Sequence, residues 1–161
     1  MAIIDELSLI YYMKIQKIIF LFILLFAIAI LNGYLFNYIN NIYFNYKSNG
    51  NDLNDFKPIL KLTIIVILAP IIETLVFQYL PNKLLNKLGV KNEFLLVFIP
   101  AMIFGLVHFY FWLYAISAFV GGILLNFLYL YIKNKNQIYV SLLIVFLFHS
   151  FYNLYGYLFV M

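Results

Sequence analysis

Three ionisable side chains, Glu73, His108 and His149, fall inside long apolar stretches of the sequence, and the two histidines are the only ones in the chain. An ionisable group within an apolar span usually faces the interior of a helix bundle or a hydrated cavity, and it usually serves function there. A carboxylate and two imidazoles can bind and release protons near neutral pH. These residues therefore indicate acid–base chemistry in a low-dielectric environment.

Sequence spacing places further polar side chains beside two of these residues. His149 and Asn153 are four residues apart, so in a helix they share one face. Thr74 and Gln78 have the same spacing, and they occupy the face next to that of Glu73. The sequence therefore predicts a small polar cluster within the apolar spans. The candidate site residues are Glu73, His108, His149 and Asn153.

Each member of this cluster also has a purely structural interpretation. His108 lies about five residues from the centre of its span, roughly 7 Å along a helix, and could be an interfacial histidine. His149 and Asn153 could form interhelical hydrogen bonds worth about 0.6–2 kcal/mol. Glu73 could be a protonated carboxyl bonded to a neighbour. Residue types and spacing alone leave these alternatives open.

The composition is that of an integral membrane protein. Of the 161 residues, 66% are hydrophobic and 10% are charged, against about 25% charged in a soluble domain. There is no cysteine, which excludes disulfides and thiolate chemistry. All ten basic residues are lysines that flank the apolar runs. We expect the net charge of +4 to serve membrane topology and contacts with anionic lipid, not binding of nucleic acid.

The apolar runs predict an all-α, polytopic transmembrane bundle of about five spans. The runs are continuous and do not alternate with period two, so helices are expected rather than a barrel. The Asn-rich segment 37–58 and the segment 81–93 are expected to be loops, and HFYFW at 108–112 is expected to be a turn. The predicted helices cover residues 18–36, 60–80, 94–111, 113–132 and 137–158.

The distribution of lysines predicts the orientation of the bundle. With five spans, one side carries seven lysines and the other carries three. The positive-inside rule then places the amino terminus and the 81–93 segment in the cytoplasm, and the carboxyl terminus outside. The tripeptide AIA at 27–29 resembles a signal-peptide cleavage site, but the apolar run continues to Phe36, which favours a retained span.

Three short motifs, in order, resemble those of the CPBP intramembrane protease family. That family includes the type II CAAX prenyl endopeptidases and bacterial bacteriocin-processing or immunity (Abi) proteins. Its first motif, E-E-x-x-x-R, resembles APIIETLVFQ, which contains Glu73. Its second, F-x-x-x-H, resembles FGLVH with His108, and its third, H-x-x-x-N, resembles HSFYN with His149 and Asn153.

The resemblance covers about residues 60–158 and divides the chain in two. Residues 1–59 form an N-terminal transmembrane helix with the Asn-rich loop, and residues 60–161 form a CPBP-like protease core. Two positions depart from the first motif, because Thr74 replaces a Glu and Gln78 replaces an Arg. An intrahelical ion pair thereby becomes a hydroxyl–amide pair, which leaves no unpaired buried ion. We interpret this as a variant scaffold in which both residues support the site.

The resemblance implies hydrolysis of a peptide bond by a glutamate-activated water. Glu73 would be the general base and His108 would orient the water, while His149 and Asn153 would donate hydrogen bonds to the oxyanion. No cofactor is expected. Zinc is the alternative, with His108, His149 and Glu73 as ligands, because two histidines and a carboxylate can hold zinc with an open position.

The expected partners are membrane lipid and a membrane-associated peptide or protein substrate, and the expected location is the plasma membrane of a bacterium. The first alternative is a non-catalytic membrane immunity or binding protein of the same fold, which Thr74 and Gln78 motivate. The second is a proton-coupled transporter, which the absence of an internal repeat in the sequence disfavours.

Overall fold

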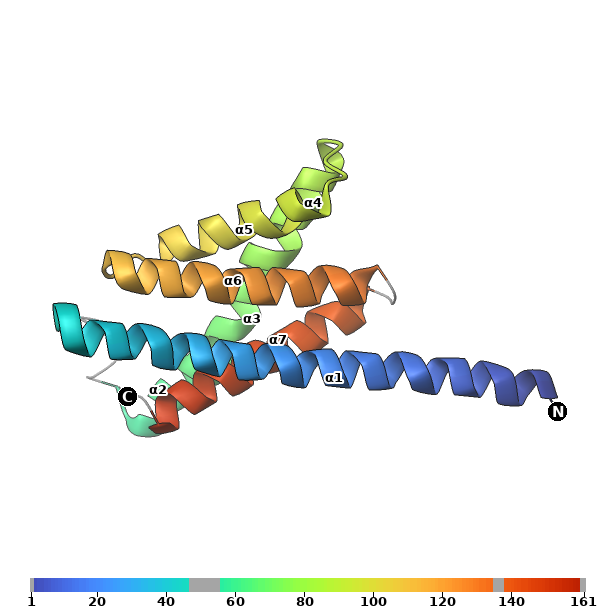
Figure 1. Ribbon diagram of the computed structural model, residues 1–161, viewed down its shortest axis with the longest axis horizontal. Coiled ribbons are helices and arrows are strands. Elements are labelled where there is room, and N and C mark those ends of the chain that lie inside the picture. The colour runs from blue at the N-terminus through green and yellow to red at the C-terminus, as the bar shows by residue number, and fades with distance from the viewer. Residues whose placement is uncertain (1, 47–55, 135–137, 160–161) are drawn as a thin grey trace.

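The computed structural model describes residues 2–46, 56–134 and 138–159, with side chains from residue 15 onward. Within these ranges every regular element is a helix, so the all-α prediction is confirmed. The η elements are π-helices, in which an N–H bonds to the carbonyl five residues earlier. In chain order the elements are α1 (Ala2–Ile39), η1 (Asn40–Phe44), α2 (Pro58–Thr63), η2 (Ile64–Leu68), α3 (Ala69–Glu73), η3 (Thr74–Tyr79), α4 (Leu80–Lys87), α5 (Glu93–Val107), α6 (Trp112–Lys133) and α7 (Ile138–Phe159) (Figure 1).

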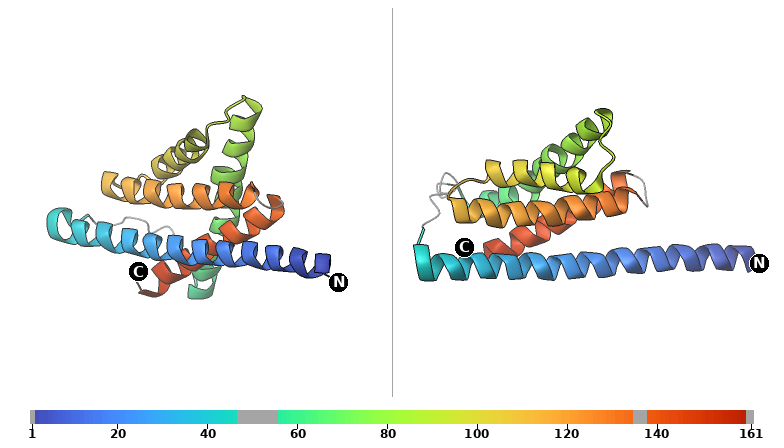
Figure 2. Two further views of the ribbon diagram at one scale, coloured as in Figure 1. Left: turned by 45° about the vertical axis from the view of Figure 1, so that its right-hand side comes forward. Right: turned by 45° about the horizontal axis from the view of Figure 1, so that its top comes forward.

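Four helical stretches in the described ranges are long and apolar enough to cross a membrane, so this is an integral membrane protein. They are Ile15–Phe44, Pro58–Lys87, Trp112–Lys133 and Ile138–Phe159. Helix α5 is apolar but has only 15 residues, which gives a length of about 22 Å against a hydrocarbon core of about 30 Å. The chain reverses direction at each connection, so α5 also runs between the two ends of the bundle (Figures 1 and 2).

The prediction of a loop beginning at residue 37 is wrong, because α1 continues into η1 as far as Phe44. A local hydrogen-bond pair ends the helix there. The Asn40 side chain accepts a hydrogen bond from the backbone N–H of Tyr46 and donates one to its carbonyl, at 3.0 Å each. Asn45 between them takes a left-handed conformation with φ of 52°. Residues 47–55 of the predicted Asn-rich loop lie outside the described ranges.

Two further boundaries differ from the prediction. Most of the expected 81–93 loop is helical, because α4 extends to Lys87 and Pro81 falls in its first turn, where a missing N–H is tolerated. The third predicted helix ends at Val107 and not at residue 111. The turn expected at 108–112 occupies 108–111, and the extended backbone of Phe111, with φ of −155°, leads into α6.

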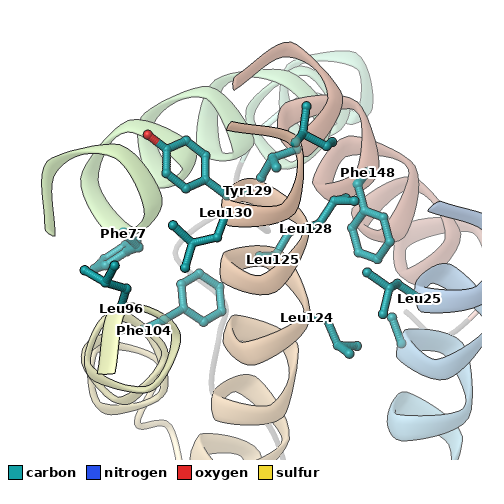
Figure 3. Packing of buried hydrophobic residues seen from close by; sticks show 13 residues of the cluster. Leu25, Phe77, Leu96, Phe104, Leu124, Leu125, Leu128, Tyr129, Leu130 and Phe148 are labelled. Carbon is teal, nitrogen blue, oxygen red and sulfur yellow. The ribbon is translucent and has the colours of Figure 1, made fainter. Parts of the chain in front are cut away.

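Helix α6 lies at the centre of the bundle, with α5 and η3 on one side and α1 and α7 on the other (Figure 3). Leu128 and Ile132 of α6 are fully buried. A Cβ added at Gly122 would lie 3.0 Å from the Cα of Ala101, so glycine permits the close approach of α5 and α6. This bears out the expected packing role of Gly122, whereas Gly121 has open space at the same point.

Helix α1 is joined to the rest of the bundle by polar and aromatic contacts. The amide nitrogen of Asn32 donates to both the carbonyl and the hydroxyl oxygen of Ser117, at 3.1 Å each. Leu25 and Ala29 of α1 belong to the buried core. Near the other end of the span, the Trp112 indole N–H donates to the Tyr46 hydroxyl at 3.1 Å, next to the turn that carries His108.

Candidate active site

The helix that carries Glu73 is irregular along its whole length. From Pro58 to Lys87 it passes through five segments that alternate between α and π hydrogen bonding. Glu73 is the last residue of the short segment α3, between two π-helices. π-helical turns usually occur as isolated insertions and are frequent at functional sites. Pro70, buried near the start of α3, removes a backbone N–H from this region.

The carboxylate of Glu73 faces both histidines of the protein. Its Oε2 lies 3.4 Å from Nε2 of His149 and 3.8 Å from Nε2 of His108. The Glu73 side chain is 21% exposed, the His108 side chain 18% and the His149 side chain 6%. Three sequence-predicted residues from three separate helical regions therefore converge on one partly open site.

His108 reaches the site because α5 ends early. Its backbone N–H donates to the carbonyl of Phe104 at 3.2 Å, which closes the last helical turn. Its ring Nδ1 lies 2.8 Å from the same carbonyl oxygen, and a carbonyl can only accept, so we assign the proton to Nδ1. In the neutral ring, Nε2 is then an acceptor directed at Glu73. This is the geometry that would bind a water hydrogen.

His149 has the complementary arrangement. It is buried in the middle of α7, and its Nδ1 has no hydrogen-bond partner within the described residues. An unpaired buried N–H is rarer in proteins than an unpaired acceptor, so we assign the proton to Nε2. Nε2 then donates toward Glu73 at 3.4 Å. One imidazole therefore offers an acceptor to the site and the other a donor.

Two phenylalanines enclose the histidines and restrict solvent at the site. Phe77 and Phe104 lie against each other in Figure 3, with ring centroids 5.3 Å apart and planes at 86°. The Phe104 ring is 4.1 Å from that of His108 and 5.9 Å from that of His149. Because their centroids fall in the normal range for aromatic pairs, these contacts fix the imidazole orientations by packing. The sequence motifs contained both phenylalanines, but their wall around the site was not foreseen.

Asn153 makes a contact that the sequence did not predict. Its amide nitrogen donates at 2.9 Å to the backbone carbonyl of Ile65 in η2, which links α7 to the Glu73 helix. One of its two amide hydrogens is thus committed to the scaffold. The sequence signal for this role was Pro70, because a proline inside a helix leaves an earlier carbonyl without its backbone donor.

Thr74 and Gln78 do not form the expected hydroxyl–amide pair. Both side chains are buried, at 2% and 0% exposure. The Thr74 hydroxyl and both polar atoms of the Gln78 amide have no hydrogen-bond partner within the described residues. These residues lie in the π-helix η3, whose wider turn changes the side-chain positions assumed for an α-helix. A buried neutral amide is tolerated here, where an unpaired Arg would not be.

The donors of the site have the chemistry of a zinc site but not its arrangement. Two imidazole nitrogens and a carboxylate are common zinc ligands. Across the described residues, however, no group of three or more His, Cys, Asp or Glu side chains is placed to hold a metal ion. The zinc alternative stays a prediction, and no step below depends on a metal.

Comparison with protein families agrees with this geometry. The family model described as Type II CAAX prenyl endopeptidase Rce1-like matches residues 55–155, which is 101 of the 161 residues. The chain belongs to the Rce1-like family. This confirms the CPBP relationship inferred from the three motifs, and it identifies the fold as that of a CAAX-type intramembrane protease. No curated protein and no solved structure matches the chain.

The matched region of this Rce1-like chain contains the three converging side chains, Glu73, His108 and His149, together with Asn153. It leaves out α1, although Leu25 and Ala29 of α1 lie in the same buried core. Helix α1 is thus an additional part of the bundle, packed against α6 and α7 through Asn32 and Phe22.

Proposed function

We propose that this Rce1-like protein is an intramembrane endopeptidase that hydrolyses a membrane-associated peptide or protein with a glutamate-activated water. The observation that supports this most directly is the position of Glu73 Oε2, within 3.8 Å of both histidine Nε2 atoms. A carboxylate acts as a general base when it lies within reach of a water that a second group orients. The acceptor on His108 and the donor on His149 supply the two remaining functions.

The proposed reaction uses each group once. A water held between Glu73 and His108 transfers a proton to the Glu73 carboxylate as its oxygen attacks the scissile carbonyl carbon. The carbonyl electron pair moves onto its oxygen, toward which the Nε2–H of His149 donates. The carbonyl then re-forms, the C–N bond breaks, and the proton on Glu73 passes to the leaving nitrogen. The products are a carboxylic acid and an amine.

The test compares the wild-type protein with Glu73→Gln in liposomes. The probes are a farnesylated CAAX peptide and a set of unmodified membrane-spanning peptides, incubated in ¹⁸O-labelled water. We expect the wild type to release a fragment that carries one ¹⁸O in its new carboxylate, and Glu73→Gln to reduce its rate of formation by about 10²–10⁴-fold. Mass spectrometry measures both quantities, and it also shows which class of peptide is cleaved.

Glu93→Gln is the matched control for this experiment. Glu93 begins α5 away from the site, and its Oε1 accepts a hydrogen bond from the Asn134 amide at 3.1 Å, which a glutamine carbonyl can also accept. We expect this variant to retain the wild-type rate. Equal cleavage by wild type and Glu73→Gln would count against the hydrolase. A folded Glu73→Gln protein that keeps its cellular phenotype would favour the non-catalytic immunity or binding role.

We also propose that the protein lies in a bacterial plasma membrane with its amino terminus in the cytoplasm. Because the chain has no cysteine, single cysteines can report orientation directly. We expect Lys57→Cys to react with a membrane-impermeant maleimide in intact cells and Lys87→Cys to react only after permeabilisation. These positions lie at opposite ends of the helix from Pro58 to Lys87. The reverse labelling pattern would invert the proposed orientation.

A further inference from the structure

The contact between Asn153 and Ile65 occupies a backbone position that has no donor of its own. In η2 the N–H of Ala69 bonds to the carbonyl of Ile64, following the π pattern. The next bond of this pattern would run from residue 70 to the carbonyl of Ile65, but residue 70 is a proline and has no N–H. The α pattern offers no substitute, because it would need the N–H of Ala69. The Asn153 amide supplies the missing bond at 2.9 Å.

The register of η2 decides where Glu73 points. A single π-turn adds about one residue to a helix, so its loss would rotate every following side chain by about 100°, the step per residue of an α-helix. Glu73 follows η2 directly, as the last residue of α3. A rotation of that size would turn its carboxylate away from the His149 Nε2, which now lies 3.4 Å away.

We propose that Asn153 is a positioning residue, whose amide stabilises the π-turn at Pro70 and thereby directs Glu73 toward the two histidines. It acts through the backbone of the Glu73 helix and not by hydrogen bonding to a reacting oxygen. The site-specific part of this inference rests on the proposed hydrolase function, but the coupling between Asn153 and Pro70 does not.

A second junction in the same molecule shows the device without a catalytic neighbour. Pro100 lies inside α5, so the carbonyl of Leu96 four residues earlier lacks its usual donor. The buried amide of Asn82 donates to that carbonyl at 3.3 Å. In both junctions an asparagine from another helical segment satisfies a carbonyl released by a proline. Only the Pro70 junction directly precedes an ionisable residue of the site.

The test is a double-mutant cycle between Asn153→Ala and Pro70→Ala. Pro70→Ala restores an N–H that can bond to the Ile65 carbonyl, so it removes the need for Asn153. We expect Asn153→Ala alone to lower kcat about 100-fold with little change in KM, because a misplaced catalytic group can cost that much. In the Pro70→Ala background the same substitution should lower kcat less than fivefold. An equal loss in both backgrounds would overturn the proposal in favour of a direct oxyanion donor.

An infrared measurement keeps the test independent of turnover. The carboxyl band of Glu73 is identified as the one that Glu73→Gln removes. We expect Asn153→Ala to shift this band and the Pro70→Ala/Asn153→Ala pair to restore it. The control pair is Asn82→Ala with Pro100→Ala, which should leave the band in place. An unchanged band in Asn153→Ala would overturn the positioning role, whether or not the wild type cleaves any peptide. Absence of cleavage with a band that shifts and returns would instead refute only the hydrolase.

Discussion

The two proline junctions of this bundle solve one backbone problem in different settings. At Pro70 the surrounding helix takes up two π segments, and the junction carries Glu73 with it. At Pro100 helix α5 remains regular from Glu93 to Val107, and its neighbours are apolar or amide side chains. The released carbonyl is satisfied in both. The difference shows that a helix irregularity contributes to chemistry only when an ionisable side chain follows it closely.

The largest effect of this contrast is expected at His149, on the Pro70 side. We expect His149→Gln to lower turnover about 10²–10³-fold, because it removes the hydrogen-bond donor proposed for the oxyanion. The measurement is the rate of ¹⁸O-labelled fragment release per folded molecule. Asn82→Ala, on the Pro100 side, is the control and should keep its turnover. Retained turnover in His149→Gln would remove the distinction between the two junctions.

The next effect concerns the packing that closes the Pro100 side. We expect Gly122→Val to destabilise the protein by about 3 kcal/mol, because its side chain would overlap the α5 backbone at Ala101, 3.0 Å from the new Cβ. Gly121→Val is the matched control, since nothing lies within 4 Å of a Cβ there. Thermal unfolding in detergent micelles measures both. Equal stability of the two variants would show that α5 and α6 are less closely packed than described.

A smaller loss is expected from the Asn82 contact itself. Asn82→Ala should reduce the free energy of unfolding by about 2 kcal/mol, because it leaves the buried Leu96 carbonyl without a partner. Its turnover per folded molecule should stay at the wild-type value. Unfolding and turnover measured on the same preparation test both parts. A loss of turnover without a loss of stability would place the Pro100 junction within the catalytic machinery.

The smallest expected effect is a gain. Thr74→Val should increase the free energy of unfolding by about 1 kcal/mol, because the buried Thr74 hydroxyl has no partner in the described residues and valine has nearly the same shape. Thr63→Val is the control, because the Thr63 hydroxyl donates to the Ile59 carbonyl at 2.8 Å. Thermal unfolding should show the gain only at Thr74. A loss there would indicate that this hydroxyl has a partner in the membrane.

Much of this architecture followed from the sequence. The prediction of a bundle of apolar helices and the turn near residue 108 are confirmed, because apolar runs bounded by lysines leave few alternatives in lipid. The helix ends were harder to predict, because side-chain bonds decide them. The pair of hydrogen bonds between Asn40 and Tyr46 is one example. The spacing of the motifs also singled out the three side chains that meet.

Sequence spacing failed where it assumed a regular α-helix. It predicted a bond between Thr74 and Gln78 that the π-helix η3 does not allow, and it gave Asn153 no backbone partner. Pro70 and Pro100 showed where carbonyls would be released. Which side chain from another helix would reach each carbonyl could not be read from the chain, because that depends on how the helices cross.

The sequence by itself determined that the protein resides in a membrane, that it is helical, and that its few ionisable groups lie inside apolar spans. The cost of placing such groups in lipid is local, and it is evident from residue type alone. Only the tertiary structure decided that one carboxylate faces both imidazoles and that an asparagine on α7 supports the turn before it. Those contacts join residues far apart in the chain, and the register of a π-turn and the crossing of helices set their distances.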